Sequence, residues 1–219
     1  MRMNQIVAIN GSPKAEGSVS GMFINQIEHI LGTKITVYQA TKLIRQERIS
    51  AALSDILQAE RLFIVFPLYV DSLPAPLIHL LTLIEQEAVN TSARLPTIYA
   101  ICNCGFYEAE HTQLALHIIE NFTIRSGLSW GYGIGIGGGG FVLSQSKKNS
   151  KGQVGGVYTV LEGICNAIEE GGLKRNNVFV TPKIPRFLYM LGGNIGWLQM
   201  ARKYGTWRSL RAKPHKESS

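Results

Sequence analysis

The stretch QIVAINGSPKAEGSVSG (residues 5–21) joins a short apolar run to a polar loop and then to the first turn of a helix. The run at residues 5–10 is continuous rather than alternating, which is typical of a strand buried on both faces of a parallel sheet. Residues 18–31 then place apolar side chains at helical spacing on one face. We therefore expect a strand, a loop and a helix, in this order, at the start of an α/β domain.

The alternation of strand and helix continues along most of the chain. After the first strand and helix, the expected strands are 34–39, 61–67, 95–103 and 128–136, and the expected helices are 49–60, 75–88, 108–127 and 154–172. This order predicts an α/β sandwich of three layers around a five-stranded parallel sheet. In such sheets ligands bind beyond the carboxyl ends of the strands, near the point where the strand order reverses.

The composition is typical of a globular protein with one principal domain. The chain has 219 residues, of which 45% are hydrophobic, and this is enough for a full core. We expect neither a signal peptide nor a membrane-spanning segment, because the first apolar run is short and no later run is long enough. The three cysteines form no C-x-x-C pair, so we expect a cytoplasmic protein.

The positive charge of the chain is concentrated at its C-terminal end. Residues 171–219 contain ten Lys or Arg and one acid, a balance of +9, whereas residues 1–170 contain twelve basic and fourteen acidic residues, a balance of −2. A nucleic-acid-binding domain carries its charge on a folded face with a recognisable motif, and none is present. We therefore expect a domain at residues 1–180, a basic extension at residues 181–219, and no nucleic-acid partner.

The loop after the first strand carries the donors that a phosphate monoester needs. Ser12, Ser18 and Ser20 supply hydroxyl groups, and Lys14 supplies a positive charge. The start of the following helix adds backbone N–H groups and a favourable dipole. The alternative is that Ser18 or Ser20 only caps the helix. The pattern G-x-x-x-x-G-K-[ST] is missing, which argues against a nucleoside triphosphatase.

Two further loops follow buried strands and carry aromatic side chains. FPLYVDSLPAPL (residues 66–77) holds Tyr69 and Asp71 at its tip, and NCGFYE (residues 103–108) offers glycine and aromatic residues before a helix. An aromatic ring beside backbone N–H groups suits a planar heterocycle, because the ring can stack while the amides bond its edge. The alternative for the second loop is an ordinary proline-rich turn.

Together, INGSPK…GSVS, PLYVDSLPAPL and the glycine-containing third loop resemble the flavodoxin-like NAD(P)H-dependent FMN reductase family. The resemblance covers residues 4–170 and implies a flavodoxin-like fold. It implies that the first loop holds the FMN phosphate, that the second borders the isoalloxazine ring, and that the third adds contacts. The cofactor-binding residues that it implies are Ser12, Lys14, Ser18, Val19 and Ser20 in the first loop, Pro67, Leu68, Tyr69, Val70 and Asp71 in the second, and Asn103, Gly105 and Phe106 in the third.

The same resemblance implies an oxidoreductase that passes hydride from NADPH or NADH, through bound FMN, to a small electron acceptor. The candidate acceptors are a quinone, a free flavin, an azo or nitro compound, and a metal ion. This chemistry needs no protein acid or base, so we assign no catalytic residue. Two alternatives stay open: a flavodoxin-type electron carrier, and a non-catalytic FMN-binding protein that acts through its basic extension.

The cysteines and histidines do not predict a metal site. We expect Cys102 and Cys104, at the end of a strand, to point to opposite faces, and His111 and His117 to face different sides of a helix. Relatives of the reductases that bind an iron–sulfur cluster need a run of cysteines that this chain lacks. We therefore expect neither a metal ion nor a cluster.

The C-terminal extension mixes apolar, aromatic and basic residues. An apolar stripe at spacings of three and four predicts a helix, which Gly192, Gly193 and Gly196 weaken unless a partner surface covers it. The stripe consists of Ile184, Leu188, Leu191, Ile195 and Leu198. We favour packing on the parent domain or on a second subunit, in a homodimer or homotetramer. The alternatives are peripheral contact with an anionic membrane and recognition of the NADPH 2′-phosphate.

The run GYGIGIGGGG (residues 131–140) contains the spacing G-x-G-x-x-G at Gly133, Gly135 and Gly138. A dinucleotide-binding fingerprint of this kind ends the first strand of its domain and opens a helix. Here the run comes late and leads into a polar segment, residues 141–152, that does not indicate a helix. We therefore expect the match to be accidental, and we expect the run to form a wall of the flavin site or a subunit contact.

Overall fold

A computed structural model describes residues 5–14, 16–45, 49–91, 94–145, 152–169 and 176–210 of the chain. The chain forms two compact units, Met1–Lys183 and Ile184–Ser219. The first unit contains the β-sheet and the helices that cover it. The second contains the C-terminal helix α8 (Arg186–Lys203).

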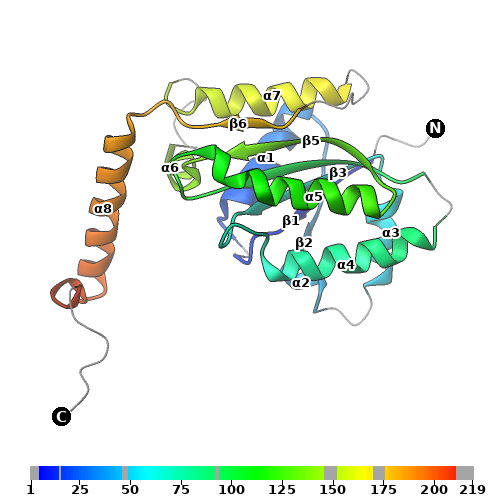
Figure 1. Cartoon of the computed structure of the whole chain (residues 1–219), viewed down its shortest axis with the longest axis horizontal. Helices are drawn as coiled ribbons and strands as arrows, with labels where there is room; N and C mark the ends of the chain where they lie inside the picture. The colour runs from blue at the N-terminus through cyan, green and yellow to red at the C-terminus, as the bar shows by residue number, and fades with distance from the viewer. Residues whose placement is uncertain are drawn as a thin grey trace, which may run out of the picture. The chain divides into compact units, whose positions relative to one another are not determined.

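One sheet runs through the first unit. Within the described ranges it has six parallel strands in the order β2-β1-β3-β4-β5-β6 (Figure 1). The strands are β1 (Ile6–Asn10), β2 (Thr36–Gln39), β3 (Arg61–Pro67), β4 (Thr97–Asn103), β5 (Ser129–Ile136) and β6 (Val178–Val180). The chain places β2 on one side of β1 and then crosses over to place β3 on the other side. In an open parallel sheet, this reversal of order opens a crevice at the carboxyl ends of the strands.

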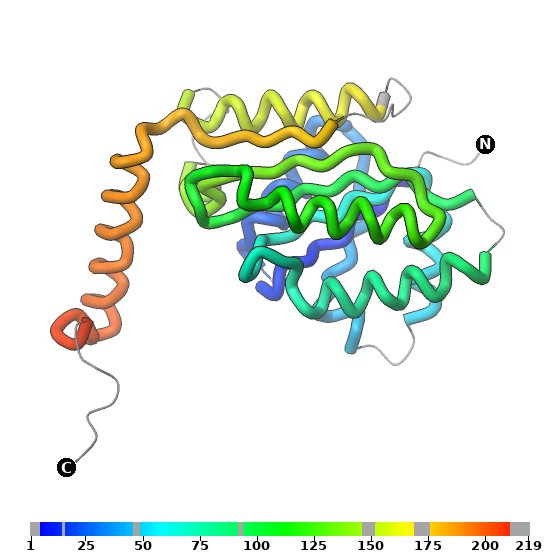
Figure 2. The backbone as a smooth tube through the Cα atoms, in the orientation of Figure 1, coloured from blue at the N-terminus to red at the C-terminus, as the bar shows by residue number. Residues whose placement is uncertain are grey.

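Helices cover both faces of this sheet (Figures 1 and 2). One face carries α2 (Ala40–Leu43), α3 (Ser50–Gln58), α4 (Ala75–Val89), the short 3-10 helix η1 (Ala109–Thr112) and α5 (Gln113–Arg125), and the other carries α1 (Val19–Leu31), α6 (Gly139–Gln145) and α7 (Gly155–Glu169). The unit therefore has a hydrophobic core on each side of the sheet. The central strands β3 and β4 are buried along nearly their whole length, which explains their continuous apolar runs.

Local sequence signals set the ends of several helices. Ser18 caps α1, because its Oγ accepts a hydrogen bond from Gly21 N–H at 3.0 Å. Gly32 ends the same helix with φ 59°, a left-handed conformation that glycine adopts without strain. Pro76 lies in the first turn of α4, where a missing N–H costs no hydrogen bond.

The expected three-layer α/β architecture is confirmed, but the strand count of five is wrong. β6 is a sixth strand, and it pairs in parallel with residues 134–136 of β5. Its three residues are too few to show a hydrophobic period, and they lie partly exposed at the edge of the sheet. The sequence pattern therefore gave no signal for it.

Two smaller expectations are also wrong. Residues 141–145 belong to α6, where the sequence did not indicate a helix, and Val142 is buried in the core beside α1. Cys102 and Cys104 do not point to opposite faces, since both are buried in the core layer beneath α4 and α5. Side chains two residues apart on a strand share a face, so the expectation misapplied the strand period.

The second unit consists of α8 and the 3-10 helix η2 (Trp207–Ser209). The helix continues through Gly192, Gly193 and Gly196 without a break. Among the described side chains of α8, that of Ala201 alone is buried. Throughout the described residues, every helix is too short or too polar to cross a bilayer.

Candidate functional site

Three loops begin at neighbouring strand ends on the carboxyl edge of the sheet. They follow β1, β3 and β4 and comprise, among the described residues, 11–14 with 16–18, then 68–74, and then 104–108. Backbone hydrogen bonds join their starts: Gly11 N–H donates to Val65 O at 2.8 Å, and Leu68 N–H donates to Asn103 O at 2.8 Å. The sheet therefore brings together the three loops that the sequence singled out.

The loop after β1 presents backbone N–H groups that no protein atom accepts. Within the described part of the chain, the N–H groups of residues 17–20 have no acceptor, whereas that of Gly21 donates to Ser18 Oγ. We call residues 17–20 the amide cradle. Gly17 has φ 60° and turns the chain into α1, whose first turn contains no acidic side chain. Unpaired N–H groups at the positive end of a helix dipole form a binding site for an anion.

Two residues that sequence reasoning missed hold this loop in place. Asn10 Oδ1 accepts from Ser12 N–H at 3.0 Å, and Asn10 Nδ2 donates to Ser18 Oγ at 3.4 Å. Gln39, at the end of β2, donates from Nε2 to Ser12 O. The bond from Asn10 to the N–H two residues on is an Asx turn, and an Asn between a strand and a glycine is the signal that could have revealed it.

Ser12 and Lys14 have different places in the loop. Ser12 is buried, and its Oγ accepts from Lys14 N–H at 3.2 Å, so this hydroxyl shapes the turn. Lys14 is exposed, and its Nζ donates to Gly17 O at 3.1 Å. The ammonium group therefore lies beside the amide cradle, where it adds to the positive potential of the helix terminus.

Asn103 and Ser20 contact each other below the site. Asn103 Nδ2 donates to Ser20 Oγ at 3.2 Å and to Phe66 O at 3.0 Å, and both side chains are buried. One amide thus links α1, β3 and β4. The sequence placed both residues among the cofactor contacts, and the structure shows them joining the elements that carry the loops. Val19 is half-buried against the core on the α1 side.

The loop after β3 forms a tight turn at its tip. Tyr69 and Ser72 exchange backbone hydrogen bonds of 2.9 and 3.0 Å around Val70 and Asp71. Both central residues have left-handed backbones, with φ 49° at Val70 and 56° at Asp71. A β-branched residue is strained there, and the Val70 side chain is 98% exposed, so packing does not compensate. The turn presents Tyr69 at the edge of the site with half of its surface exposed.

The predicted residues at the start of this loop lie deeper than its tip. Leu68 is buried in the core layer beneath α4 and α5, and Pro67 is the partly buried last residue of β3. These two residues therefore support the turn from below, and the exposed chemistry of the loop belongs to residues 69–71.

The loop after β4 exposes an aromatic ring. Phe106 is 54% exposed, and its ring centroid lies 4.5 Å from that of His111 on η1. His111 Nε2 in turn lies 3.9 Å from Glu108 Oε2. Gly105 is exposed and has open space around it. Cys104 is buried, and burial raises the pKa of its thiol to about 11, so the thiol is protonated at neutral pH.

The glycine run at residues 131–140 uses its N–H groups within the protein. Gly137, Gly138 and Gly139 donate to Val180 O, Phe106 O and Cys104 O at 3.0, 2.6 and 2.8 Å. An added Cβ at Gly133 would lie 2.9 Å from Leu116 Cδ2 of α5. These glycines therefore permit close packing of β5 against its neighbours, and these three amides are not available to a phosphate.

Comparison with solved structures establishes which fold carries this site. A structure described as NADH:FMN oxidoreductase (EMOB), apo form, matches with a TM-score of 0.59 over 79% of this chain and 92% of its own, at 16% identity. General stress protein 14 from Treponema denticola, in complex with FMN, matches with a TM-score of 0.52 over 74% of this chain and 99% of its own, at 11% identity. The fold is flavodoxin-like.

A third flavodoxin-like match is Trp repressor binding protein from Bacillus subtilis, with a TM-score of 0.50 over 67% of this chain and 98% of its own, at 14% identity. No protein-family model matches the sequence, and no curated protein has a similar sequence. At these identities the likeness is one of fold. The fold that the resemblance implied is therefore confirmed.

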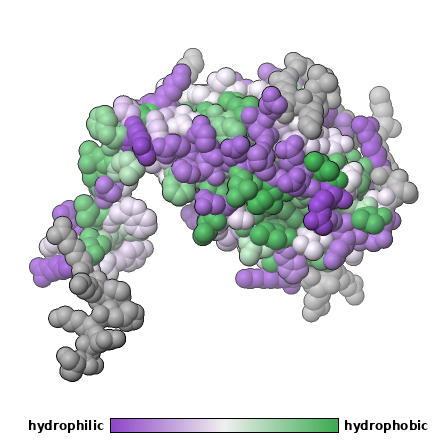
Figure 3. Space-filling model, in the orientation of Figure 1, coloured by the Kyte–Doolittle hydropathy of each residue, from purple (hydrophilic) through white to green (hydrophobic). Residues whose placement is uncertain are grey.

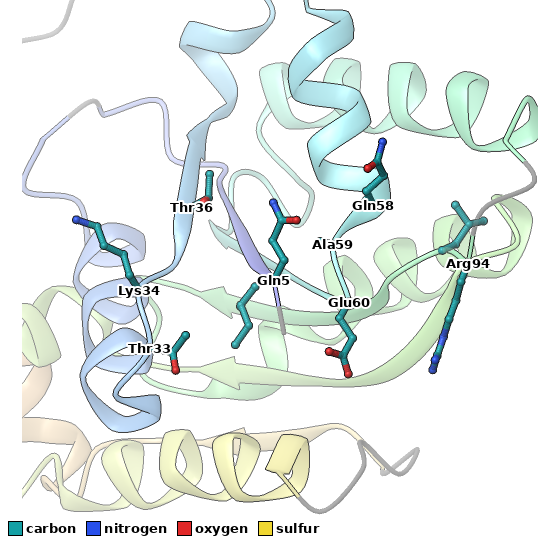
Figure 4. Close-up of a pocket in the computed structure, with 10 residues that line it drawn as sticks. Gln5, Thr33, Lys34, Thr36, Gln58, Ala59, Glu60 and Arg94 are labelled. Atoms are coloured by element: carbon teal, nitrogen blue, oxygen red, sulfur yellow. The ribbon is translucent and has the colours of Figure 1, made fainter. Parts of the chain in front are cut away.

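A hollow of about 950 Å³ lies at the opposite, amino-terminal edge of the flavodoxin-like sheet (Figure 4). Gln5, Thr36 and Ala59 line it at or beside the starts of β1, β2 and β3, together with Lys34 and Glu60. Ligands of open parallel sheets bind beyond the carboxyl ends of the strands, and none of the three loops reaches this hollow. The candidate site is therefore the carboxyl edge.

Proposed function

We propose that this protein is an FMN-dependent oxidoreductase that transfers hydride from NADH or NADPH to a small electron acceptor. The observation that carries the proposal is the amide cradle at the reversal of strand order. Unpaired N–H groups at a helix N-terminus suit a phosphate, and the crevice beside β1 and β3 is where flavodoxin-like sheets bind FMN. The acceptor is a quinone, a free flavin, an azo or nitro compound, or a metal ion.

The residues at the carboxyl edge fit the two ends of FMN. The amide cradle and Lys14 would hold the phosphate, with Ser18 fixing the helix terminus. The exposed turn at residues 69–71 and the exposed Phe106 would border the ring system. The backbone N–H groups and the exposed rings of Tyr69 and Phe106 match a flat heterocycle with polar edges.

When bound, FMN supplies the hydride chemistry, and the protein supplies position and a polar environment. The two hydrogen bonds from Asn103 to Ser20 and Phe66, which we call the Asn103 bridge, fix α1 against β3. The phosphate end and the ring end of the site therefore keep their spacing. Cys102 and Cys104 stay protonated because burial raises the pKa of both thiols, so neither offers a thiolate to the reaction. Two of the matched structures, an NADH:FMN oxidoreductase and a protein in complex with FMN, support the choice of cofactor.

The test is to titrate the full chain with FMN and then to add NADH or NADPH without oxygen. We expect saturable binding of FMN and rapid loss of the yellow flavin absorbance with at least one of the two nicotinamides. Lys14→Gln should weaken FMN binding several-fold, whereas Lys34→Gln, an exposed lysine at the opposite edge, should not. FMN that binds but is not bleached would point to an electron carrier or a binding protein, and a chain that takes up no FMN would refute the proposal.

A further inference from the structure

We propose that the second unit, around α8, docks the protein on an anionic lipid surface. The inference rests on the exposure, charge and composition of residues 184–210, and it does not depend on the flavin chemistry proposed above. The helix cannot cross a bilayer, so the docking is peripheral, with the helix in the plane of the interface.

The side chains of α8 leave a large apolar surface exposed (Figure 3). Every described side chain of the helix except Ala201 is at least partly exposed. The exposed apolar residues include Phe187, Met190, Leu191, Ile195, Trp197 and Leu198. At 100° per residue these six positions lie within about 160° of the helix circumference, and the exposed Leu188 and Met200 widen the apolar surface to about 240°. An apolar surface of this kind marks an interaction site.

The positive charge of the second unit favours a negatively charged partner. Arg186, Arg202, Lys203 and Arg208 are its cations within residues 184–210, and that stretch contains no Asp or Glu. A second copy of α8 would bring like charges together. Anionic headgroups complement a surface that is apolar and basic at once.

Aromatic side chains stand where a lipid interface would hold them. Trp197 is 72% exposed and Tyr204 is 69% exposed. Lys203 Nζ lies 5.8 Å from the centroid of the Tyr204 ring, and Arg208 Cζ lies 5.1 Å from that of Trp207. Pairs of a ring and a cation place an apolar body beside a charged head, and this is the composition of side chains at the headgroup level.

The length of α8 agrees with a position in the interface. Its 18 residues span about 27 Å, which is less than the thickness of the hydrocarbon core. Arg202 lies among the apolar positions, and a long arginine side chain can reach the headgroups from there. The helix is therefore suited to lie on a membrane.

The test is flotation of the full chain with two kinds of vesicle, pure phosphatidylcholine and phosphatidylcholine mixed with phosphatidylglycerol. We expect the chain to float with the mixed vesicles and not with the pure ones, and to be released by salt. The triple variant Arg202→Gln, Lys203→Gln, Arg208→Gln should partition about 100-fold less. The matched control Lys34→Gln, Lys42→Gln, Arg45→Gln removes the same charge from the first unit and should partition like the wild type.

Tryptophan fluorescence gives a second measurement on the same samples. Trp197 and Trp207 are exposed and Trp130 is buried, so a shift to shorter wavelength on mixed vesicles reports the extension. The double variant Trp197→Ala, Trp207→Ala should lose this shift. Sedimentation velocity without vesicles tests the rival occupant, a second copy of the chain.

Three results would overturn the proposal. The first is equal flotation with both kinds of vesicle or with neither. The second is equal partitioning of the extension triple variant and its control. The third is a dimer that the Trp197→Ala, Trp207→Ala variant dissociates, in a chain that binds no mixed vesicles, and this result would assign the surface to self-association. None of these results bears on FMN binding, so failure here is distinguishable from failure of the proposed function.

Discussion

The amide cradle and the end of the glycine run, residues 137–140, lie at the same carboxyl edge, and each leads into a helix. The glycine run matches a dinucleotide-binding spacing, yet its N–H groups at residues 137–139 all donate to carbonyl groups of the protein. The cradle matches no such pattern, yet within the described residues its N–H groups at residues 17–20 have no acceptor. The better candidate for binding an anion is thus the loop without the motif.

The difference teaches that a match to a glycine spacing does not by itself leave backbone N–H groups available to an anion. Backbone N–H groups must find a partner, and in the glycine run β4, β6 and the third loop provide it. In the cradle the partner has to come from a ligand or from water. The following experiments test this contrast, beginning with the largest expected effect.

Ser18→Asp should weaken FMN binding at least about 100-fold. Aspartate caps a helix as well as serine does, so Gly21 N–H keeps its acceptor and the free energy of unfolding should change little. The added carboxylate, however, occupies the cradle and repels the phosphate. The dissociation constant, measured by quenching of flavin fluorescence, checks this prediction.

Gly140→Asp is the matched control for that variant. Gly140 lies exposed in the first turn of α6, and a Cβ there meets open space. We expect it to leave FMN binding within about twofold of the wild type, because the charge is added at the wrong helix terminus. If both aspartates weakened binding equally, the contrast between the two loops would be lost.

Gly131→Ala should lower the free energy of unfolding by about 2–3 kcal/mol. Its Cβ would meet the ring of buried Tyr99, with Cδ1 at 2.8 Å, and neither the strand nor the ring has room to move. Gly140→Ala should instead stabilise the protein by about 0.5–1 kcal/mol, because alanine favours the helix. Urea denaturation measures both values. Equal effects would mean that the run does not serve packing.

Much of the fold and part of the site could be predicted from the sequence. Continuous apolar runs predicted the central strands, because burial on both faces forces that pattern, and alternation at residues 34–39 predicted the partly exposed β2. β6 and α6 were not predicted, because three and seven residues are too few to show a hydrophobic period. The Asx turn of Asn10 is local and could have been predicted, but the role of Asn103 could not, because it depends on a contact with Ser20, which only the fold brings near.

The loop after β4 accepts hydrogen bonds from Gly138 and Gly139, and the contribution of its buried Cys104 to stability can be tested by pH. Burial raises the pKa of the Cys104 thiol from 9.0 to about 11, so below pH 9 the thiol is protonated in both states. Between pH 9 and 11 the unfolded chain loses the proton first, and stability therefore falls as pH rises. We expect wild type to lose about 1–2 kcal/mol more than Cys104→Ala over this interval. Equal losses in urea denaturation at pH 9 and pH 11 would show that the thiol does not contribute.

Val70→Asn should stabilise the protein by about 1 kcal/mol. The glycine run places glycine where packing needs it, whereas the second loop places valine at φ 49° without any contact that holds it there. Asparagine accepts the left-handed backbone more readily. The control Val89→Asn changes an exposed valine at the end of α4 and should not stabilise the protein. Thermal unfolding of the two variants decides the matter.

The Asn103 bridge also bears on the order in which the protein can assemble. The bond from Asn103 to Ser20 spans 83 positions of the chain, and it closes only after β4 has been synthesised and paired with β3. Contacts of such long range form late, because the intervening chain must first lose its conformational freedom. A nascent chain that ends before residue 103 therefore contains the cradle residues but lacks the Asn103 bridge that holds Ser20 in place. The proposed anion site lies near the N-terminus in sequence, but a residue from the middle of the chain completes it.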